Sequence, residues 1–199
     1  MEQTIAGETR WLVNDACSTL FGKSDLMVSD AADYPHLSLL NRLKSDAKSD
    51  QMRVFLHYLH EIHPRSHLPA RSDFDPVAVP SILPNLILVR VDRDPIRFMV
   101  RIAGDTIRHA LDEPLMGRYL DTLAGRGDSL KYPLNDRLRV VETGELRYRY
   151  GEPRLQFSLD FARVEYCHFP FANDGRRVDH ILSLLVYKAD EHVTRHETR

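Results

Sequence analysis

The hydrophobic pattern of this chain changes its period at about residue 86, and this change constrains the fold more than any other feature. Before that point the clearest signal is a helix packed on one side. Its apolar residues recur at helical spacing and are Met52, Phe55, Leu56, Leu59 and Ile62. Beyond it, residues 86–91 and 96–103 are short apolar runs on either side of a turn, which is typical of a β-hairpin. Separate helical and strand-like stretches predict an α+β fold.

The other expected elements complete a five-stranded sheet. Further helices are predicted at 11–20, 33–43, 105–111 and 128–142, and further strands at 146–150, 158–171 and 178–187. Asp50 and Asp105 are expected to cap the helices that they begin. Asp174-Gly175 favours a hairpin turn between the last two strands. The order strand–strand, helices, three strands predicts an antiparallel sheet with helices crossing one face.

This element order also divides the chain. We expect an N-terminal helical extension at 1–48, a sheet domain at 49–189 and a flexible tail at 190–199. The length of 199 residues suits one domain with extensions of this kind.

The composition is that of an ordinary globular protein, with 43% hydrophobic residues and a net charge of −2. This balance gives no reason to expect nucleic acid as a partner. No stretch approaches the ~20 apolar residues that a membrane span needs. The two cysteines, Cys17 and Cys167, lie far apart without a CxxC pattern, which favours free thiols in the cytoplasm. We expect Cys167, inside a predicted strand, to be a buried structural thiol.

Several short motifs follow one another in a fixed order. They are Leu68-Pro69-Ala70-Arg71 with Asp75-Pro76, Ile82-Leu83-Pro84, Arg101-Ile102-Ala103-Gly104-Asp105-Thr106, and Leu115-Met116-Gly117-Arg118-Tyr119-Leu120. Their order and spacing resemble a bacterial, mainly alphaproteobacterial, family of PAS domains over about residues 52–187. Asp112 departs from the family, which usually has glycine there, and Tyr58 stands where many members have tryptophan. The resemblance implies the PAS fold and a sensory or docking role, and it points away from catalysis.

Some motif residues also have physical roles that need no family. Gly104 allows the chain to turn from a strand into a helix where a Cβ would clash. Asp75 is expected to cap a helical turn that begins at Pro76. Arg71 is expected to tether this segment through charge-assisted hydrogen bonds with nearby aspartates.

Four residues are candidates for ligand contact: Arg101, Asp105, His109 and Tyr148. In PAS folds the short helix that carries His109 borders the cavity, so the resemblance implies that His109 could ligate haem or bind another ligand. A solvated His109 and a core Tyr148 are the competing interpretations. The sequence identifies no catalytic residue and no cofactor.

Arginines alternate with tyrosines along the strand predicted at 146–150. Arg147 and Arg149 share one face and Tyr148 and Tyr150 the other. With Arg137 and Arg139 nearby in the sequence, this face could bind an anionic ligand or a nucleotide. A solvated arginine face, with both tyrosines in the core, is the simpler interpretation and the one that we favour.

Four closely spaced histidines raise the question of a metal site. They are His57, His60, His63 and His67. His57 and His63 diverge by about 120° on a helix, and zinc sites usually need three or four protein ligands. We expect surface or helix-end histidines and no metal.

The leading hypothesis is a cytoplasmic sensory or signalling module that binds a small molecule or docks a signalling protein. A ligand-free interaction scaffold is the alternative, and a small enzyme using His109 and Asp105 is a third. The helix at 51–62 is a candidate homodimer surface, for which Leu56→Asp would be the test.

Overall fold

The computed structural model describes residues 35–123, 131–153 and 162–188. The predicted helix at 11–20, the tail at 190–199, Cys17 and the first residues of the strand predicted at 158–171 lie outside these ranges.

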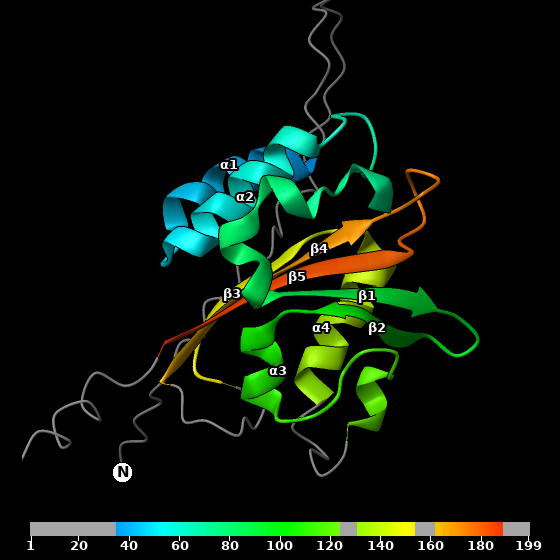
Figure 1. Cartoon of the computed structure of the whole chain (residues 1–199). Helices are drawn as coiled ribbons and strands as arrows, with labels where there is room; N and C mark the ends of the chain where they lie inside the picture. The colour runs from blue at the N-terminus through cyan, green and yellow to red at the C-terminus, as the bar shows by residue number, and fades with distance from the viewer. Residues whose placement is uncertain (1–34, 124–130, 154–161, 189–199) are drawn as a thin grey trace, which may run out of the picture. The chain divides into compact units, whose positions relative to one another are not determined.

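Five strands form one antiparallel sheet in the order β2-β1-β5-β4-β3 (Figure 1). The strands are β1 (Leu86–Asp92), β2 (Arg97–Ala103), β3 (Arg147–Gly151), β4 (Arg163–Phe171) and β5 (His180–Lys188). The strand-like stretches of the sequence therefore correspond to real strands, and the predicted five-stranded antiparallel sheet is confirmed. The strands β2 and β3 are its two edges.

Helices cover both faces of the sheet (Figure 1). The helices are α1 (Pro35–Asp46), α2 (Asp50–Ile62), α3 (Asp105–Leu111) and α4 (Lys131–Thr143). Short 3₁₀ turns lie at η1 (Arg71–Asp73), η2 (Pro76–Ala78), η3 (Pro80–Asn85) and η4 (Leu120–Thr122). The predicted arrangement of helices on one face holds for α3 and α4, whereas α1 and α2 pack on the other face.

The apolar run that begins β1 explains why a second layer of helices covers the sheet. Leu86 and Leu88 face the α1–α2 side, and Ile87 and Val89 face the α3–α4 side. A strand that is apolar at every position is typical of burial on both faces. The sheet is therefore covered by helices on both sides.

The apolar face of α2 is buried in the core of the protein. Phe55 and Leu56 are 0% exposed and belong to the same core as Phe169 of β4. Leu56→Asp would therefore place a charge in the core, and it is not a test of dimerisation. The outer face of α2 carries Val54 and His57.

Two helix caps differ from the prediction by one residue. Ser49, not Asp50, caps α2, because its Oγ accepts a hydrogen bond from the amide of Met52 at 3.2 Å. Gly104, not Asp105, is the N-cap of α3. A Cβ on Gly104 would lie 2.3 Å from the carbonyl oxygens of Leu83 and Pro84. The expected need for glycine at this turn is confirmed, and it arises from close backbone packing against η3.

No helix in the described part of the chain is long and apolar enough to cross a membrane.

Candidate functional site

The four predicted ligand residues do not converge on one site. Arg101 is an exposed bulge residue of β2, since Leu88 pairs with Ile102 and Val89 with Val100. Asp105 and His109 are exposed on α3. Tyr148 lies on β3, the opposite edge strand of the sheet, and packs against the α1–α2 core. Ligand contact by these residues stays a prediction.

Of the four, Asp105 lines a pocket of about 380 Å³ between η3 and the end of β2. The other lining residues are mostly apolar and include Phe74, Pro76, Pro80, Leu83 and Ile102. The Asp105 carboxylate forms an ion pair with Arg108 at 3.2 Å. The pocket therefore presents mainly an apolar surface, with an already paired carboxylate among its lining residues.

Tyr148 has a structural partner that the sequence analysis missed. Its hydroxyl donates a hydrogen bond to Oε1 of Glu165 at 2.7 Å, and burial together with this bond raises the pKa of Tyr148. Glu165 is 0% exposed and also accepts hydrogen bonds from the Lys48 amide at 2.7 Å and from Ser49 Oγ at 2.6 Å. Glu165, Cys167 and Phe169 are spaced two residues apart along β4, so their side chains lie on the same face of the sheet. Since Cys167 and Phe169 are core residues, this spacing was the sequence signal that Glu165 also points into the core.

The predicted Cys167 thiol is buried and free, and burial raises its pKa. It belongs to the apolar core on the α1–α2 face, as expected for a structural thiol.

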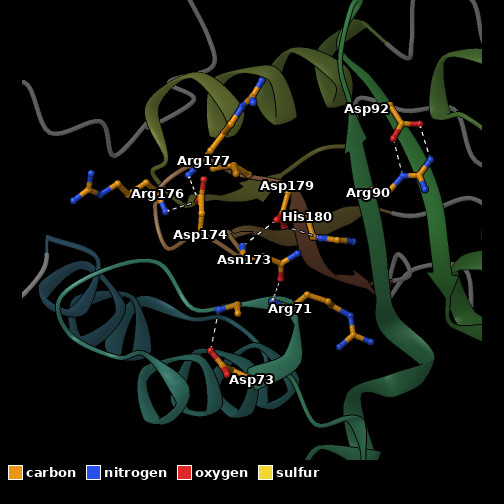
Figure 2. Close-up of polar contacts among 12 residues, drawn as sticks. Arg71, Asp73, Arg90, Asp92, Asn173, Asp174, Arg176, Arg177, Asp179 and His180 are labelled. Atoms are coloured by element: carbon orange, nitrogen blue, oxygen red, sulfur yellow. Dashed lines mark hydrogen bonds and ion pairs between the residues drawn. The ribbon is translucent and has the colours of Figure 1, made fainter.

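The Leu-Pro-Ala-Arg motif docks onto the turn between β4 and β5, part of which is drawn in Figure 2. The Leu68 amide donates to the carbonyl of Gly175 at 3.0 Å, and the Ala172 amide donates to the carbonyl of Pro69 at 2.9 Å. The Arg71 amide donates to Oδ1 of Asn173 at 3.3 Å. Together these bonds fix residues 68–71 against the last hairpin.

The expected Arg71 tether is made differently from the prediction. The Arg71 guanidinium lies 5.4 Å from the centre of the Phe74 ring and donates to the Phe74 carbonyl, rather than to an aspartate. Asp73 instead accepts a hydrogen bond from the Ala70 amide at 2.8 Å, drawn in Figure 2. The predicted cap by Asp75 is confirmed, since its Oδ1 accepts a bond from the Val77 amide at 2.9 Å. Tyr58 also binds this segment, because its hydroxyl accepts a bond from the Asp75 amide at 2.6 Å.

A shallow polar pocket of about 480 Å³ lies at the same turn. Its lining includes Ser66, His67, Asp73, Asn173 and Arg176. Asp174 accepts bonds from the amides of Arg176 and Arg177, which lower the pKa of its carboxyl (Figure 2). The polar groups around this turn thus hold the backbone, as expected for a hairpin turn.

The structure departs most from the expected arginine face on the side of β3 that faces α4. The shared face of Arg147 and Arg149 is confirmed, since they pair with His168 and Tyr166 of β4, whereas Tyr148 pairs with Cys167. Arg149 is only 8% exposed, so the expected solvated face is wrong at this position. Tyr150, expected in the core, is 38% exposed.

Arg137 of α4 lies on the same side of the sheet as this face. It is 4% exposed, and its Nη1 donates to the Pro133 carbonyl at 3.1 Å. Arg139, the other arginine considered with it, is exposed. Asp136, beside Arg137, accepts a hydrogen bond from the Tyr166 hydroxyl, which fixes α4 against β4.

Aromatic and polar groups lie beside Arg149 on this face. The Arg149 guanidinium lies 6.0 Å from the Tyr166 ring centre, and this ring stacks on His168 at 4.7 Å. Nδ1 of His168 and Oγ of Ser183 are 2.8 Å apart. We name Arg137, Arg147, Arg149, Tyr166 and His168 the arginine cluster.

Burial sets the charges within this cluster. It lowers the pKa of Arg137 to about 10, which leaves the guanidinium protonated at neutral pH. Burial, and then the charge of Arg137, hold the pKa of His168 well below 6.5, so His168 is neutral. At neutral pH the buried Arg137 therefore stays charged beside Asp136, whereas His168 is uncharged.

No group of three or more potential metal-ligating side chains occurs among the described residues. His57 is exposed. His63 lies at the C-cap of α2, as the expected helix-end position predicts, but it is buried, with its ring centre 5.8 Å from that of His36 and 6.3 Å from that of Phe169. Burial lowers the pKa of both His36 and His63 to about 4.

The comparison with protein families supports the resemblance over part of the chain. Residues 47–128 match the family described as PAS domain. This segment is similar to PAS domains. It runs from the start of α2 past η4 and includes β1, β2 and α3. The PAS-like sheet is completed by β3, β4 and β5, which lie outside the matched residues, and its α+β arrangement is consistent with the PAS fold. A search of curated proteins finds no match.

Proposed function

We propose that this chain is a PAS-type sensory module that binds a small molecule between α4 and the sheet. The observation that carries the proposal is the contrast between the two interiors. The α1–α2 side is packed mainly with apolar side chains, among them Phe55 and Phe169, and its buried carboxylate, Glu165, accepts hydrogen bonds from three groups. The α4 side combines apolar residues with the arginine cluster, and buried charge is costly unless another group compensates it.

The mechanism would be a shift in population between different arrangements of α4 on the sheet. The cluster includes one residue of α4, Arg137, and the edge strand residues Arg147 and Arg149. A ligand that contacts both elements favours the arrangement in which α4 and β3 present their side chains together. Output then passes to a signalling protein, or to a second copy of the chain, through the surface around α4. We place this module in the bacterial cytoplasm, in keeping with the buried free thiol of Cys167.

Two other functions are supported less well. In a ligand-free docking scaffold the buried Nε of Arg137, which makes no hydrogen bond to any described residue, would stay without an acceptor. An enzyme based on His109 and Asp105 requires an enclosed pair, whereas both residues are exposed on α3.

Native mass spectrometry of the purified protein, with a denatured control, tests the proposal. A reproducible extra mass that is lost on denaturation supports a bound small molecule, and an absorption spectrum shows whether it is coloured. A protein without extra mass, whose melting temperature is unchanged by a library of small metabolites, contradicts the proposal and favours the docking scaffold.

A further inference from the structure

We propose that the apolar pocket between η3 and the end of β2 is the contact surface of a homodimer, and that Val77 of each copy enters the pocket of the other. This inference goes beyond the proposed function and does not depend on a ligand near α4. The apolar face of α2, the first candidate for self-association, is buried in the core. A dimer therefore needs a different surface, and the surroundings of Val77 supply one.

Val77 is the most exposed large apolar side chain in the described part of the chain, with 81% of its surface exposed. A single exposed apolar residue is ordinary, so its exposure alone carries no argument. Its position is informative, because it directly follows Pro76, which lines the pocket. One copy of the chain thus carries an exposed apolar side chain immediately beside an apolar pocket.

Two-fold symmetry allows both features to be used at once. In an isologous dimer the same surface of the two copies is in contact, so each residue pair across the interface occurs twice. The pocket has a volume of about 380 Å³, enough to admit a valine side chain. Each Val77 that leaves water on association makes a favourable contribution, and the symmetry supplies it twice.

The wall of the pocket is already ordered in the single chain. Pro76 begins η2 and Pro80 begins η3, and proline fixes its own backbone φ. The Val79 amide donates to the carbonyl of Pro76 at 3.2 Å, and the Ile82 amide donates to the carbonyl of Val79 at 3.2 Å. Because this wall is fixed before association, little conformational entropy is lost when a second copy binds to it.

Opposite charges on the two sides of the pocket favour a second copy as the partner. On the η2 side, Asp75 precedes Pro76 and is exposed. On the other side, Arg108 pairs with the pocket-lining Asp105 at 3.2 Å, and its side chain is 52% exposed. An exposed pair of this kind holds its members weakly, so Arg108 is available to another carboxylate. In the two-fold dimer Arg108 of one copy faces Asp75 of the other, and the surface is complementary to itself in charge.

Analytical ultracentrifugation of the full chain over a range of protein concentrations tests the inference. We expect an equilibrium between monomer and dimer that shifts toward dimer as the concentration rises. Val77→Asp places a charge in the apolar pocket of the other copy and should weaken the dimer at least tenfold. Since Val77 is exposed in the single chain, the fold should tolerate this change. Val54→Asp, at an exposed valine on the outer face of α2, is the control and should leave the dissociation constant within about twofold.

Charge reversal tests the two-fold arrangement itself. Arg108→Glu and Asp75→Lys, each alone, bring like charges together and should weaken the homodimer. An equimolar mixture of these two variants should associate more tightly than either variant alone, because both contacts of the mixed dimer then join opposite charges. This gain should shrink as the salt concentration rises. Asp75 also caps η2, so urea denaturation is used to check that Asp75→Lys remains folded.

The inference is overturned if the full chain stays a monomer at every concentration, or if Val77→Asp dimerises as tightly as the parent. A mixture of the charge-reversed variants that associates no better than each variant alone also overturns it. None of these results bears on the proposed ligand near α4, which native mass spectrometry tests separately.

Discussion

Asp112 ends α3 with a left-handed backbone, φ +51°. Side chains other than glycine are strained in this region, although aspartate tolerates it better than most. We expect Asp112→Gly to raise the free energy of unfolding by up to about 1 kcal/mol, measured by urea denaturation. Gly117→Ala is the matched opposite, since Gly117 has φ +74° and open space around its missing Cβ. A loss of stability in Asp112→Gly would show that the carboxylate makes a stabilising contact.

A second glycine, Gly104, tests the space available for a Cβ atom and not the backbone angle. Gly104 has an ordinary φ of −68°, but a Cβ there would collide with two carbonyl oxygens of η3. Because backbone cannot move aside as a side chain can, we expect Gly104→Ala to cost about 3 kcal/mol or more. Gly117→Ala should cost only about 1 kcal/mol, because its cost is conformational. Equal losses in the two variants, measured by urea denaturation, would contradict the close packing of α3 on η3.

At the scale of elements, Glu165 links the corner between α1 and α2 to the edge of the sheet. Glu165→Gln replaces one acceptor oxygen with a donor that faces other donors, and we expect a loss of about 2–3 kcal/mol in unfolding free energy. Tyr148→Phe removes one of the three bonds to Glu165 and should cost about 1 kcal/mol. Hydrogen exchange at the Lys48 amide should accelerate in Glu165→Gln, since this amide loses its acceptor. Equal losses in the two variants would refute this role.

The pairing of α1 with α2 should weaken in acid. The folded pKa of both His36 and His63 is about 4, against 6.5 when unfolded, because burial disfavours the charged ring. The unfolded chain therefore binds more protons between pH 6.5 and pH 4, so stability is complete above pH 6.5 and falls toward pH 4. His36, the more deeply desolvated of the two, contributes up to about 3 kcal/mol to this loss.

His36→Leu isolates that contribution. Urea denaturation at several pH values should give a shallower fall in stability for His36→Leu than for the parent. His57→Gln, an exposed histidine of α2, should follow the parent curve. An unchanged slope in His36→Leu would show that His36 is not the titrating group, and His168, also buried, would then be examined.

Elements were predictable from the sequence because their signals are local. The alternation along β3 and the helical spacing of Met52 to Ile62 depend only on neighbouring residues. The side that each element covers was harder to predict, because it depends on contacts between distant segments. Thus Arg149 was expected on a solvated face, whereas it is buried. The burial of Glu165 depends on partners such as Lys48, which lies 117 residues away in the chain. The shared face of Arg147 and Arg149 was predicted from the alternation along the strand, whereas the burial of Arg149 was not predicted.

At the scale of the whole molecule, the sheet separates two unlike interiors (Figure 1). The α1–α2 side is mainly an apolar core, within which Glu165 is hydrogen-bonded. The α4 side carries the arginine cluster beside apolar residues such as Val140 and Ile181. The position of α1 in this division bears on the domain boundary expected at residue 48.

Contacts made by α1 argue that the sheet domain begins before residue 49. Leu40 and Leu43 of α1 are at most 1% exposed and share a core with Phe169. Truncating a single buried leucine typically costs about 2–5 kcal/mol, so a chain that begins at Ser49 should lose at least about 2 kcal/mol in unfolding free energy relative to one that begins at Asp33. Urea denaturation of the two chains measures the difference, and dye binding to the uncovered apolar face should rise in the shorter one. Equal midpoints would show instead that α1 is a separable extension and that the boundary lies at residue 48.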